Sequence, residues 1–445
     1  MMEQQILKPR CNLPMKHSDR PILRPREDVL GRSKFSLSLA RAIDDLALAR
    51  DGFVIGIIGE WGSGKSSVIE MILRSLTHLE MERTGNSIIK NIPELASAPS
   101  TLEALENFAE TYDLIRDKIE IFDQKNSDFS KAHYKFRHQL FRESLKSSEE
   151  AIKADIYWQL LEAVRSSPKT IQVRFSPWLI AGRGELATAL MSELARALGE
   201  NAGPDIREAF ASFLERLSEL APIAGAGLDA ATGTGFGRLL SATGSLSKSA
   251  AAKLASGPTL DKLRENLRNL LRHLPNQKIL VVIDDLDRLM PNEAAEMVSL
   301  VKTLGDLPNV VYLLSYDQKN LAKLIAESMR LDGVEYLQKI VQYPVHLPPL
   351  LGDKLSKILD ADISELLGEL DTNDTRRIGS TWYFALRHYL KTPRDVRLYT
   401  NSLAVTLASQ RDYVDPIDQM MLEILRLHEP DVYSWVRENL SELTE

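Results

Sequence analysis

Residues Asp51 to Ile69 read DGFVIGIIGEWGSGKSSVI, and this stretch decides the fold. Its apolar start predicts a buried strand, and the helical spacing of apolar residues at its end predicts a helix. Between them lies Gly59-x-x-x-x-Gly64-Lys65-Ser66, the spacing of a phosphate-binding loop in the strand–loop–helix context that this motif requires. A plain glycine-rich turn is the weaker alternative, because the strand and helix patterns flank the loop on both sides. The stretch therefore predicts a nucleoside triphosphate site.

Each residue type of this loop answers a need of bound phosphate. The glycines let backbone N–H groups turn toward phosphate oxygens, and the start of the helix adds about half a positive charge. We expect Lys65 to reach the β- and γ-phosphates and Ser66 to offer its hydroxyl to Mg²⁺. The expected cofactors are ATP and Mg²⁺. The predicted nucleotide-binding residues of the loop are Gly59, Trp61, Gly62, Ser63, Gly64, Lys65, Ser66 and Ser67.

A second block, Lys278 to Arg288, reads KILVVIDDLDR and supplies carboxylates. Its continuous apolar run is typical of a strand that is buried on both faces of a parallel sheet. Asp284, at the end of this strand, is predicted to hold Mg²⁺ through water beside Ser66. Asp285 is predicted to orient or deprotonate the attacking water. A helix cap or a turn is the alternative role for these acids.

Composition limits the possible classes of protein. The 445 residues exceed one compact domain, so we expect a core with insertions or a second helical domain. The formal net charge of −7 gives no global attraction to nucleic acid or anionic lipid, although it leaves room for a local basic patch. The single cysteine, Cys11, excludes an intramolecular disulfide and a cysteine metal cluster. With a polar start and no long uncharged stretch, the sequence predicts a soluble, cytoplasmic protein without a membrane span.

The interval between the two motifs is longer than a strand–helix–strand unit needs. Leu102 to Arg165 is charged with helical periodicity, which predicts a helical insertion. Leu220 to Gly257 is rich in Ala, Gly, Ser and Thr, which predicts either a flexible linker or closely packed small-residue helices. The other elements expected here are a helix ending near Leu79, a strand at Thr170–Phe175 closed by Pro177, and helices at Gly184–Leu198 and Leu260–Leu274.

After the acidic strand the pattern alternates between helix and strand, which predicts a parallel sheet. From Gly352 onward the pattern is helical only and indicates a lid domain. The expected elements are a helix at Asn292–Leu304, a strand at Asn309–Asp317, a helix at Lys319–Met329 and a short strand near Val341–Leu347. The expected domains are residues 1–81 with the start of the core, an insertion at 82–168, the rest of the core at 169–350 including the 220–257 segment, and a lid at 351–445.

Several segments that span nearly the whole chain match one known pattern. They are Asp19-Arg-Pro-Ile, Glu27 to Arg32, Gly59 to Ser67, Phe175-Ser-Pro-Trp178, Ile283 to Arg288, Tyr336 to Ile340, Thr392-Pro-Arg394-Asp and Asp418 to Pro430. The pairing of GEWGSGKSS with IDDLDR is much more specific than a phosphate loop alone. On these segments the chain resembles the KAP family of phosphate-loop NTPases, a branch near the AAA+ and STAND ATPases.

The resemblance implies an α/β P-loop NTPase fold, with a central parallel β-sheet flanked by helices, a large helical insertion and a C-terminal helical lid. Many family members carry transmembrane helices between the two motifs, but here that interval holds charged and small residues, which argues against membrane anchoring. Many similar bacterial proteins serve in defence against phage with proteins encoded beside them. A homo-oligomer or such a complex is therefore the expected assembly.

The resemblance also assigns roles to two arginines. Arg288 is placed like a finger that acts on the γ-phosphate of a neighbouring subunit, or it simply pairs with Asp285 or Asp287. Arg394, in Thr-Pro-Arg at the start of a lid helix, is similar to a sensor arginine that touches the γ-phosphate and reports hydrolysis to the lid. A solvated arginine at a helix start is the alternative for Arg394.

Three further positions have a sharp and a plain interpretation. Ser315, at a strand end, resembles a first sensor that hydrogen-bonds phosphate or water, or it is an ordinary polar strand end. Gly31 and Arg32 bring backbone toward the adenine, or they form a turn before a helix. Trp178 is expected to be a buried aromatic after Pro177 rather than an anchor facing a substrate.

Together these residues predict a Mg²⁺-dependent ATPase that acts as a nucleotide-driven switch or assembly factor, with the resemblance pointing to anti-phage defence. The catalytic residues would be Lys65, Asp284, Asp285, Arg288, Arg394 and Ser315. The alternative is a structural scaffold that binds ATP with negligible hydrolysis. A kinase acting on a small acceptor is disfavoured because no acceptor-binding motif is evident.

Overall fold

The computed structural model falls into two compact units, which we describe separately. One, here called the loop–lid unit, comprises Met1–Ser33, Gly59–Val68 and His346–Glu445, and the other, the sheet unit, comprises Lys34–Ile58 and Ile69–Val345. Of the expected insertion at 82–168, residues 82–89 continue the helix Lys65–Ile89, residue 168 is also described, and the rest lies outside the described residues, as does the Ala/Gly-rich segment 220–257. The structure describes residues 21–22, 28–47, 51–89, 168–180, 186–201, 205–206, 208–209, 211–213, 260–274, 276–350, 352–368, 371–410 and 414–443.

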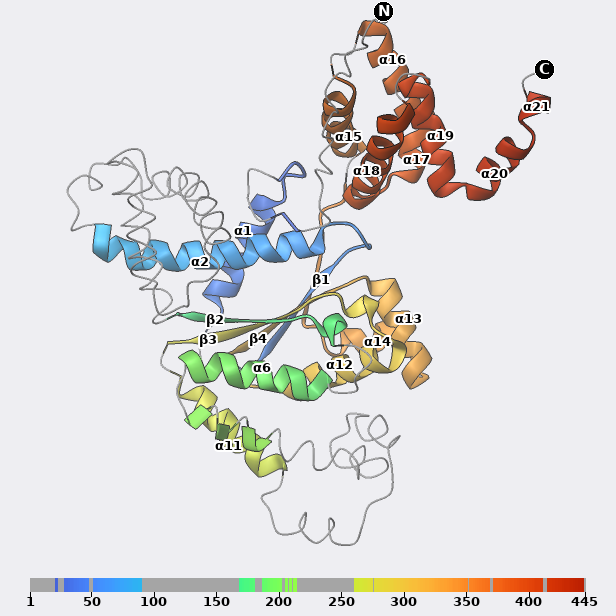
Figure 1. The fold of residues 1–445 in the computed structure, drawn as a ribbon. Coiled ribbons are helices and arrows are strands. Elements are labelled where there is room, and N and C mark those ends of the chain that lie inside the picture. Colours follow the sequence, from blue (N-terminus) through green and yellow to red (C-terminus); the bar gives the residue numbers. More distant parts are fainter. Residues whose placement is uncertain are drawn as a thin grey trace, which may run out of the picture. The chain divides into compact units, whose positions relative to one another are not determined.

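Five strands form the sheet, in the spatial order β2-β3-β4-β1-β5. Figure 1 labels β1 to β4. Every pairing among β1 to β4 is parallel, so the predicted α/β fold with a parallel sheet is confirmed. β3 and β4 are mostly apolar, with Lys278 and Ser315 as exceptions, and all their residues are buried, as expected for strands covered on both faces. The strands are β1 (Phe53–Ile58), β2 (Thr170–Phe175), β3 (Lys278–Ile283), β4 (Val310–Tyr316) and β5 (Tyr343–His346).

Helices cover both faces of the sheet, with α2 on one face and α6 and α12 on the other (Figure 1). Leucines and methionines of α6 and α12 pack with strand residues in one apolar core, where each fully buried aliphatic side chain contributes about 1.5–3 kcal/mol. The expected helices are present, although α2 continues beyond Leu79. The helices that contribute to this unit are α1 (Ser33–Asp45), α2 (Lys65–Ile89), α6 (Leu186–Asn201), α11 (Leu260–Arg272), α12 (Pro291–Leu304), α13 (Gln318–Met329) and α14 (Gly333–Gln338), with the 3₁₀ turns η3 (Pro177–Leu179) and η4 (Leu286–Arg288).

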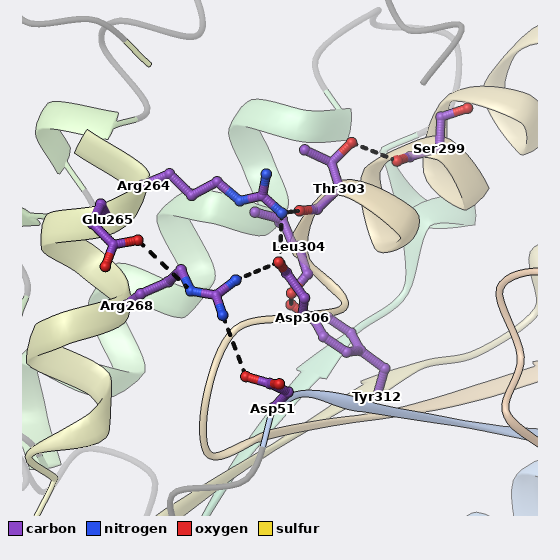
Figure 2. A network of polar contacts seen from close by, with 9 residues as sticks. All are labelled: Asp51, Arg264, Glu265, Arg268, Ser299, Thr303, Leu304, Asp306 and Tyr312. Carbon is purple, nitrogen blue, oxygen red and sulfur yellow. Dashed lines mark hydrogen bonds and ion pairs between the residues drawn. The ribbon is translucent and has the colours of Figure 1, made fainter. Parts of the chain in front are cut away.

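The amino ends of the strands are held by a network of ion pairs (Figure 2). Arg264 and Arg268, one helical turn apart on α11, both bind the carboxylate of Asp306, which precedes β4. Arg264 also donates to the carbonyl oxygen of Thr303 at 3.1 Å, and Arg268 reaches Asp51, which precedes β1, at 3.3 Å. Helix α11 is thereby fixed to the loops that enter two neighbouring strands.

Lys278, the first residue of β3, is buried at the same end of the sheet. Its ammonium donates to three carbonyl oxygens at the end of α1, those of Ile43 at 2.9 Å, Asp44 at 2.7 Å and Leu46 at 2.9 Å. A cation at a helix C-terminus satisfies carbonyls that have no partner within the helix. Burial, reinforced by the neighbouring Lys169, lowers the pKa of Lys278 to about 8.

The lid part of the loop–lid unit is entirely helical, as predicted, and has its own apolar core. Buried leucines and isoleucines of α15, α16, α18 and α19 meet around Tyr399, whose hydroxyl donates to the carbonyl oxygen of Met420 at 2.9 Å. None of the described helices is long and apolar enough to cross a membrane. The elements are α15 (Gly352–Leu367), α16 (Thr372–Thr381), the π-helical turn η5 (Trp382–Leu386), α17 (Arg387–Tyr389), α18 (Pro393–Gln410), α19 (Pro416–His428), α20 (Pro430–Glu438) and α21 (Leu440–Leu443).

Candidate nucleotide-binding site

The predicted phosphate loop has the backbone of a tight anion-binding turn. The chain leaves β1 at Ile58 and enters α2 at Lys65, and the loop between them contains two left-handed glycines, Gly62 with φ +77° and Gly64 with φ +91°. Residues with a Cβ rarely adopt such angles, so glycine is required at both positions. The first turn of α2 leaves backbone N–H groups without helical partners, which is the usual binding site for phosphate.

Lys65 lies folded back on this loop. Its ammonium donates to the carbonyl oxygens of Gly59 at 3.0 Å and Glu60 at 3.3 Å, and its side chain is only 6% exposed. The hydroxyl of Ser63 is buried and has no hydrogen-bond partner among the described residues. A buried ammonium beside an unsatisfied hydroxyl fits a polyanionic ligand, because phosphate oxygens accept hydrogen bonds from both groups.

The two serines that follow Lys65 differ in their surroundings. The hydroxyl of Ser67 accepts a hydrogen bond from the backbone N–H of Ile22 at 3.2 Å, which attaches the N-terminal segment to the start of α2. Ser66 is half-buried at the second position of the helix, where a hydroxyl ligand for Mg²⁺ is expected. The metal role of Ser66 stays a prediction.

Arg32 binds the phosphate loop directly. Its guanidinium, only 4% exposed, donates to the carbonyl oxygens of Ser63 and of Pro348, the latter at 3.1 Å. Burial lowers the pKa of Arg32, and the nearby Asp28 carboxylate offsets part of this effect; an arginine still remains charged. Gly31, with φ +69°, forms the turn that precedes α1. The observed contact of Arg32 is thus with the loop backbone, and the adenine role of Gly31 and Arg32 stays a prediction.

The predicted sensor arginine also meets the loop. The guanidinium carbon of Arg394, in the first turn of α18, lies 4.4 Å from the ring centre of Trp61 in a cation–π contact. Close packing supports this contact, because a Cβ on Gly62 would lie 2.8 Å from the hydroxyl of Thr392 and 2.9 Å from Cβ of Arg394. The loop and the start of α18 are therefore in direct contact within the loop–lid unit.

In the sheet unit, the acidic motif forms a short turn at the end of β3. Asp285 is left-handed, with φ +60°, an uncommon conformation for a residue other than glycine and one that often marks functional sites. Its backbone N–H donates to the carboxylate of Asp284 at 2.9 Å. Its own carboxylate lies 3.1 Å from Nε of Arg288. Of the two interpretations of Arg288, the structure thus displays the local ion pair with Asp285.

Ser315 lies one strand away, near the carboxyl end of β4. Its side chain is fully buried, and its hydroxyl lacks a hydrogen-bond partner within the described part of the chain. A buried hydroxyl that makes no hydrogen bond costs about 1–3 kcal/mol, so it needs a reason to persist. An unsatisfied donor at this edge of a parallel sheet is consistent with contact to a ligand or an ordered water.

The expectation that Trp178 is buried was wrong. Its side chain is 51% exposed, and Arg288 lies 5.9 Å above its ring. The cause is the 3₁₀ turn η3, in which Pro177 takes the buried position and directs the following indole outward.

Among the described residues, no three His, Cys, Asp or Glu side chains gather in a way that would hold a metal ion on their own. Mg²⁺ usually takes one or two protein ligands together with phosphate oxygens and waters. The Ser66 hydroxyl and the Asp284 carboxylate are oxygen ligands of the kind that Mg²⁺ prefers.

The sequence did not reveal the contacts of Arg32. They join residues 31 and 316 positions apart in the chain, and only the short Gly-Arg pair marked the position. Thr392 was visible only as part of the Thr-Pro-Arg segment. In both cases the sequence marked the residue as part of a short motif but did not indicate its contacts.

Comparison with known proteins gives two results. A model of the KAP family P-loop domain matches residues 32–409. The chain is also similar to the "Phage T7 exclusion protein" of Escherichia coli (strain K12), with 25% identity over 426 residues. That match covers 94% of this chain and 47% of the relative, so the chain spans about half the length of the curated relative it matches.

Proposed function

Because the chain belongs to the KAP family of P-loop domains, we propose that it binds ATP with Mg²⁺ and hydrolyses it as a nucleotide-driven switch or assembly factor. Support for binding comes from the loop itself, where a buried Lys65, two left-handed glycines and a helix start converge. Each is a feature that binds phosphate.

Phosphoryl transfer to water depends on positioning and charge neutralisation rather than on covalent chemistry by the protein. Lys65 and the loop N–H groups would neutralise the β- and γ-phosphates. Ser66 and Asp284 would hold Mg²⁺, which supplies further positive charge to the phosphate oxygens when bound. Asp285 would align the attacking water, and Ser315 would hydrogen-bond that water or the phosphate.

The observation that carries the switch is the contact between Trp61 and Arg394. A cation–π contact at a partly exposed ring contributes about 0.5–1 kcal/mol. A hydrogen bond between a guanidinium and phosphate contributes about 1.5–3 kcal/mol. A bound γ-phosphate would therefore offer Arg394 a stronger partner than the Trp61 ring. Because Arg394 begins α18, that exchange would pass directly into the helical lid.

The biological setting rests on the relative. The name of this relative describes exclusion of phage T7, and on that basis we propose that this chain takes part in defence against phage. A homo-oligomer or a complex with proteins encoded nearby would provide the assembly that such a switch controls. The second candidate function, an ATP-binding scaffold with negligible turnover, is favoured by one observation, the pairing of Asp285 with Arg288, which keeps the proposed water-aligning carboxylate engaged.

Two measurements on the full chain separate these functions. Titration with a fluorescent ATP analogue reports binding. Steady-state phosphate release reports hydrolysis, and it is measured with and without Mg²⁺ and with and without the proteins encoded nearby. The switch predicts both binding and Mg²⁺-dependent release that are lost in Lys65→Ala. Binding without release under every condition would identify the scaffold. Absence of binding would reject both.

A further inference from the structure

One continuous helical stretch of the lid presents an unusual face to solvent. It consists of α16, η5 and α17, and its buried side carries Ile378 and Leu386. The π-helical turn η5 inserts one extra residue between them and so keeps both on the core side. Such turns are frequent at functional sites. The opposite side carries aromatic and cationic residues, which we call the aromatic–basic surface: Arg376, Tyr383, Phe384, Arg387 and Lys391, the last just beyond α17.

Two aromatic rings lie open on this surface. Tyr383 is 54% exposed and Phe384 76% exposed, and their rings pack edge to face with centres 5.1 Å apart. The guanidinium carbon of Arg387 lies 3.9 Å from the centre of the Tyr383 ring. Exposed rings add little to the stability of the lid, because most of their apolar surface stays in water. The pair therefore points to binding of another molecule rather than to folding.

This stretch differs from the rest of the chain in its charge composition. Residues 375–394 contain five Arg or Lys and no Asp or Glu, whereas the whole chain has 62 acidic and 55 basic residues. One of the five, Arg377, is already paired with Asp415 and Asp418. Exposed cations remain at Arg376, Arg387 and Lys391. Exposed cations beside exposed aromatic rings favour a partner that has both negative charge and flat π-surfaces.

We propose that the aromatic–basic surface binds single-stranded nucleic acid, with bases stacked on Tyr383 and Phe384 and phosphates held by Arg387, Arg376 and Lys391. Base–aromatic stacking and basic residues along the backbone are the two elements of sequence-tolerant single-strand binding. An acidic protein would satisfy the charges but not the open rings. An anionic membrane would require a broader apolar face than two side chains provide.

The surface also shows how the two elements would work together. Arg387 covers one face of Tyr383 and keeps its N–H donors in the guanidinium plane, where they can reach a phosphate. Phe384, the more exposed ring, offers the larger stacking area. DNA and RNA share this chemistry, so the test includes both.

The test is fluorescence anisotropy with the full chain and labelled oligonucleotides of about 16 nucleotides. The probes are oligothymidylate, oligouridylate, an abasic strand of equal length, a duplex, and labelled polyglutamate. Thymidylate or uridylate should bind at least about tenfold more tightly than the abasic strand and polyglutamate. With three cations engaged, log K against log salt should have a slope of about −2. A stronger response to thymidylate or to uridylate identifies DNA or RNA as the partner.

Variants connect binding to the surface. Phe384→Ala and Tyr383→Ala should each weaken binding about tenfold, and Arg387→Ala should weaken it and flatten the salt slope. All three residues are exposed, so the thermal midpoint should not change. Trp435→Ala and Arg437→Ala are matched controls, because both side chains are exposed on α20, outside the surface, and should bind as the wild type does.

Three results would overturn the proposal. The first is no binding at low salt with or without ATP. The second is equal affinity for the abasic strand, which would mean attraction to any polyanion. The third is binding that the aromatic substitutions leave unchanged.

Discussion

The amino and carboxyl ends of the β-strands differ in how their polar side chains are paired. At the amino ends, Arg264 and Arg268 share Asp306 (Figure 2). Lys278 donates to three carbonyl oxygens at the same ends. The amino ends thus hold several charged groups in ion pairs and hydrogen bonds within the fold, although Nε of Arg264 makes no hydrogen bond to the described residues. At the carboxyl ends, the fully buried Ser315 hydroxyl makes no hydrogen bond to the described residues. In open α/β sheets, ligands bind at the carboxyl ends of the strands.

This contrast predicts that substitutions at the two ends have separable effects. The carboxyl ends, together with the phosphate loop that follows β1 in the chain, should control turnover. The amino ends should control the free energy of unfolding.

The largest effect should come from Lys65→Ala. Without the ammonium, the β- and γ-phosphates lose their main protein charge, so ATP affinity or turnover should fall by on the order of 10²-fold or more. Titration with an ATP analogue and phosphate release measure the two effects, with Lys65→Arg as the variant that keeps the charge. Unchanged binding and unchanged hydrolysis in Lys65→Ala would remove the nucleotide site.

Asp285→Asn should separate hydrolysis from binding. The substitution keeps the size of the side chain and removes the carboxylate that would align water, so phosphate release should drop about 10²-fold while ATP affinity is retained. Asp287→Asn is the matched control two residues away. Should Asp285→Asn hydrolyse ATP at the wild-type rate, Asp287 would become the next candidate.

A smaller effect, about tenfold, is expected for Arg288→Ala, because this side chain pairs with Asp285. Mixing Arg288→Ala with Lys65→Ala tests whether the arginine acts between subunits. If it does, the Lys65→Ala subunit donates its arginine, and part of the ATPase activity returns with a steep dependence on concentration. Arg394→Ala should lower turnover without such rescue. No recovery and a monomeric mass in ATP would leave Arg288 as a local partner of Asp285.

Arg268→Ala should instead weaken the fold. It removes the contacts with Asp306 and Asp51 that join α11 to two strand-entry loops, so the free energy of unfolding should fall by about 1–2 kcal/mol. Chemical denaturation measures this change, and a double-mutant cycle with Asp306→Asn isolates the pair. ATP turnover per folded molecule should stay at the wild-type level. A loss of turnover in the folded variant would contradict the expectation that the amino ends of the strands affect only stability.

The smallest effect is a pH dependence at Lys278. Its pKa is about 8 in the fold and 10.5 otherwise, so between these values the unfolded chain binds more protons. The cost of the buried charge is thus fully present below pH 8 and is relieved as pH rises toward 10.5. Unfolding free energies of wild type minus Lys278→Met should rise across this window, by on the order of 1 kcal/mol. A flat difference would show an ordinary lysine pKa.

Much of the fold was accessible from sequence because its strands are continuous apolar runs. β3 and β4 are buried along their whole length. Short elements were harder. α14 has only six residues and starts from the Asp332 side chain, which accepts a hydrogen bond from the backbone N–H of Glu335. Such a local cap leaves little periodicity to detect.

The candidate site was predicted as a set of residues but not as a set of contacts. The phosphate-loop spacing identified Lys65 because the chemistry requires adjacent positions. The contacts of Arg32 with Ser63 and Pro348 depend on how distant segments pack, which spacing does not encode. Trp178 shows the converse failure, since hydrophobicity alone predicted burial and a single 3₁₀ turn reversed it.

The hydrogen bonds from Lys65 to the carbonyl oxygens of Gly59 and Glu60 also set a minimum interaction energy that a ligand of Lys65 must supply. Any ligand that draws the ammonium away must first replace two hydrogen bonds to a charged group, each worth about 1.5–3 kcal/mol. A nucleoside triphosphate meets this demand with its β- and γ-oxygens. A nucleoside monophosphate has neither a β- nor a γ-phosphate, so it does not replace the two hydrogen bonds that Lys65 would lose. We therefore expect the loop to favour triphosphates over monophosphates.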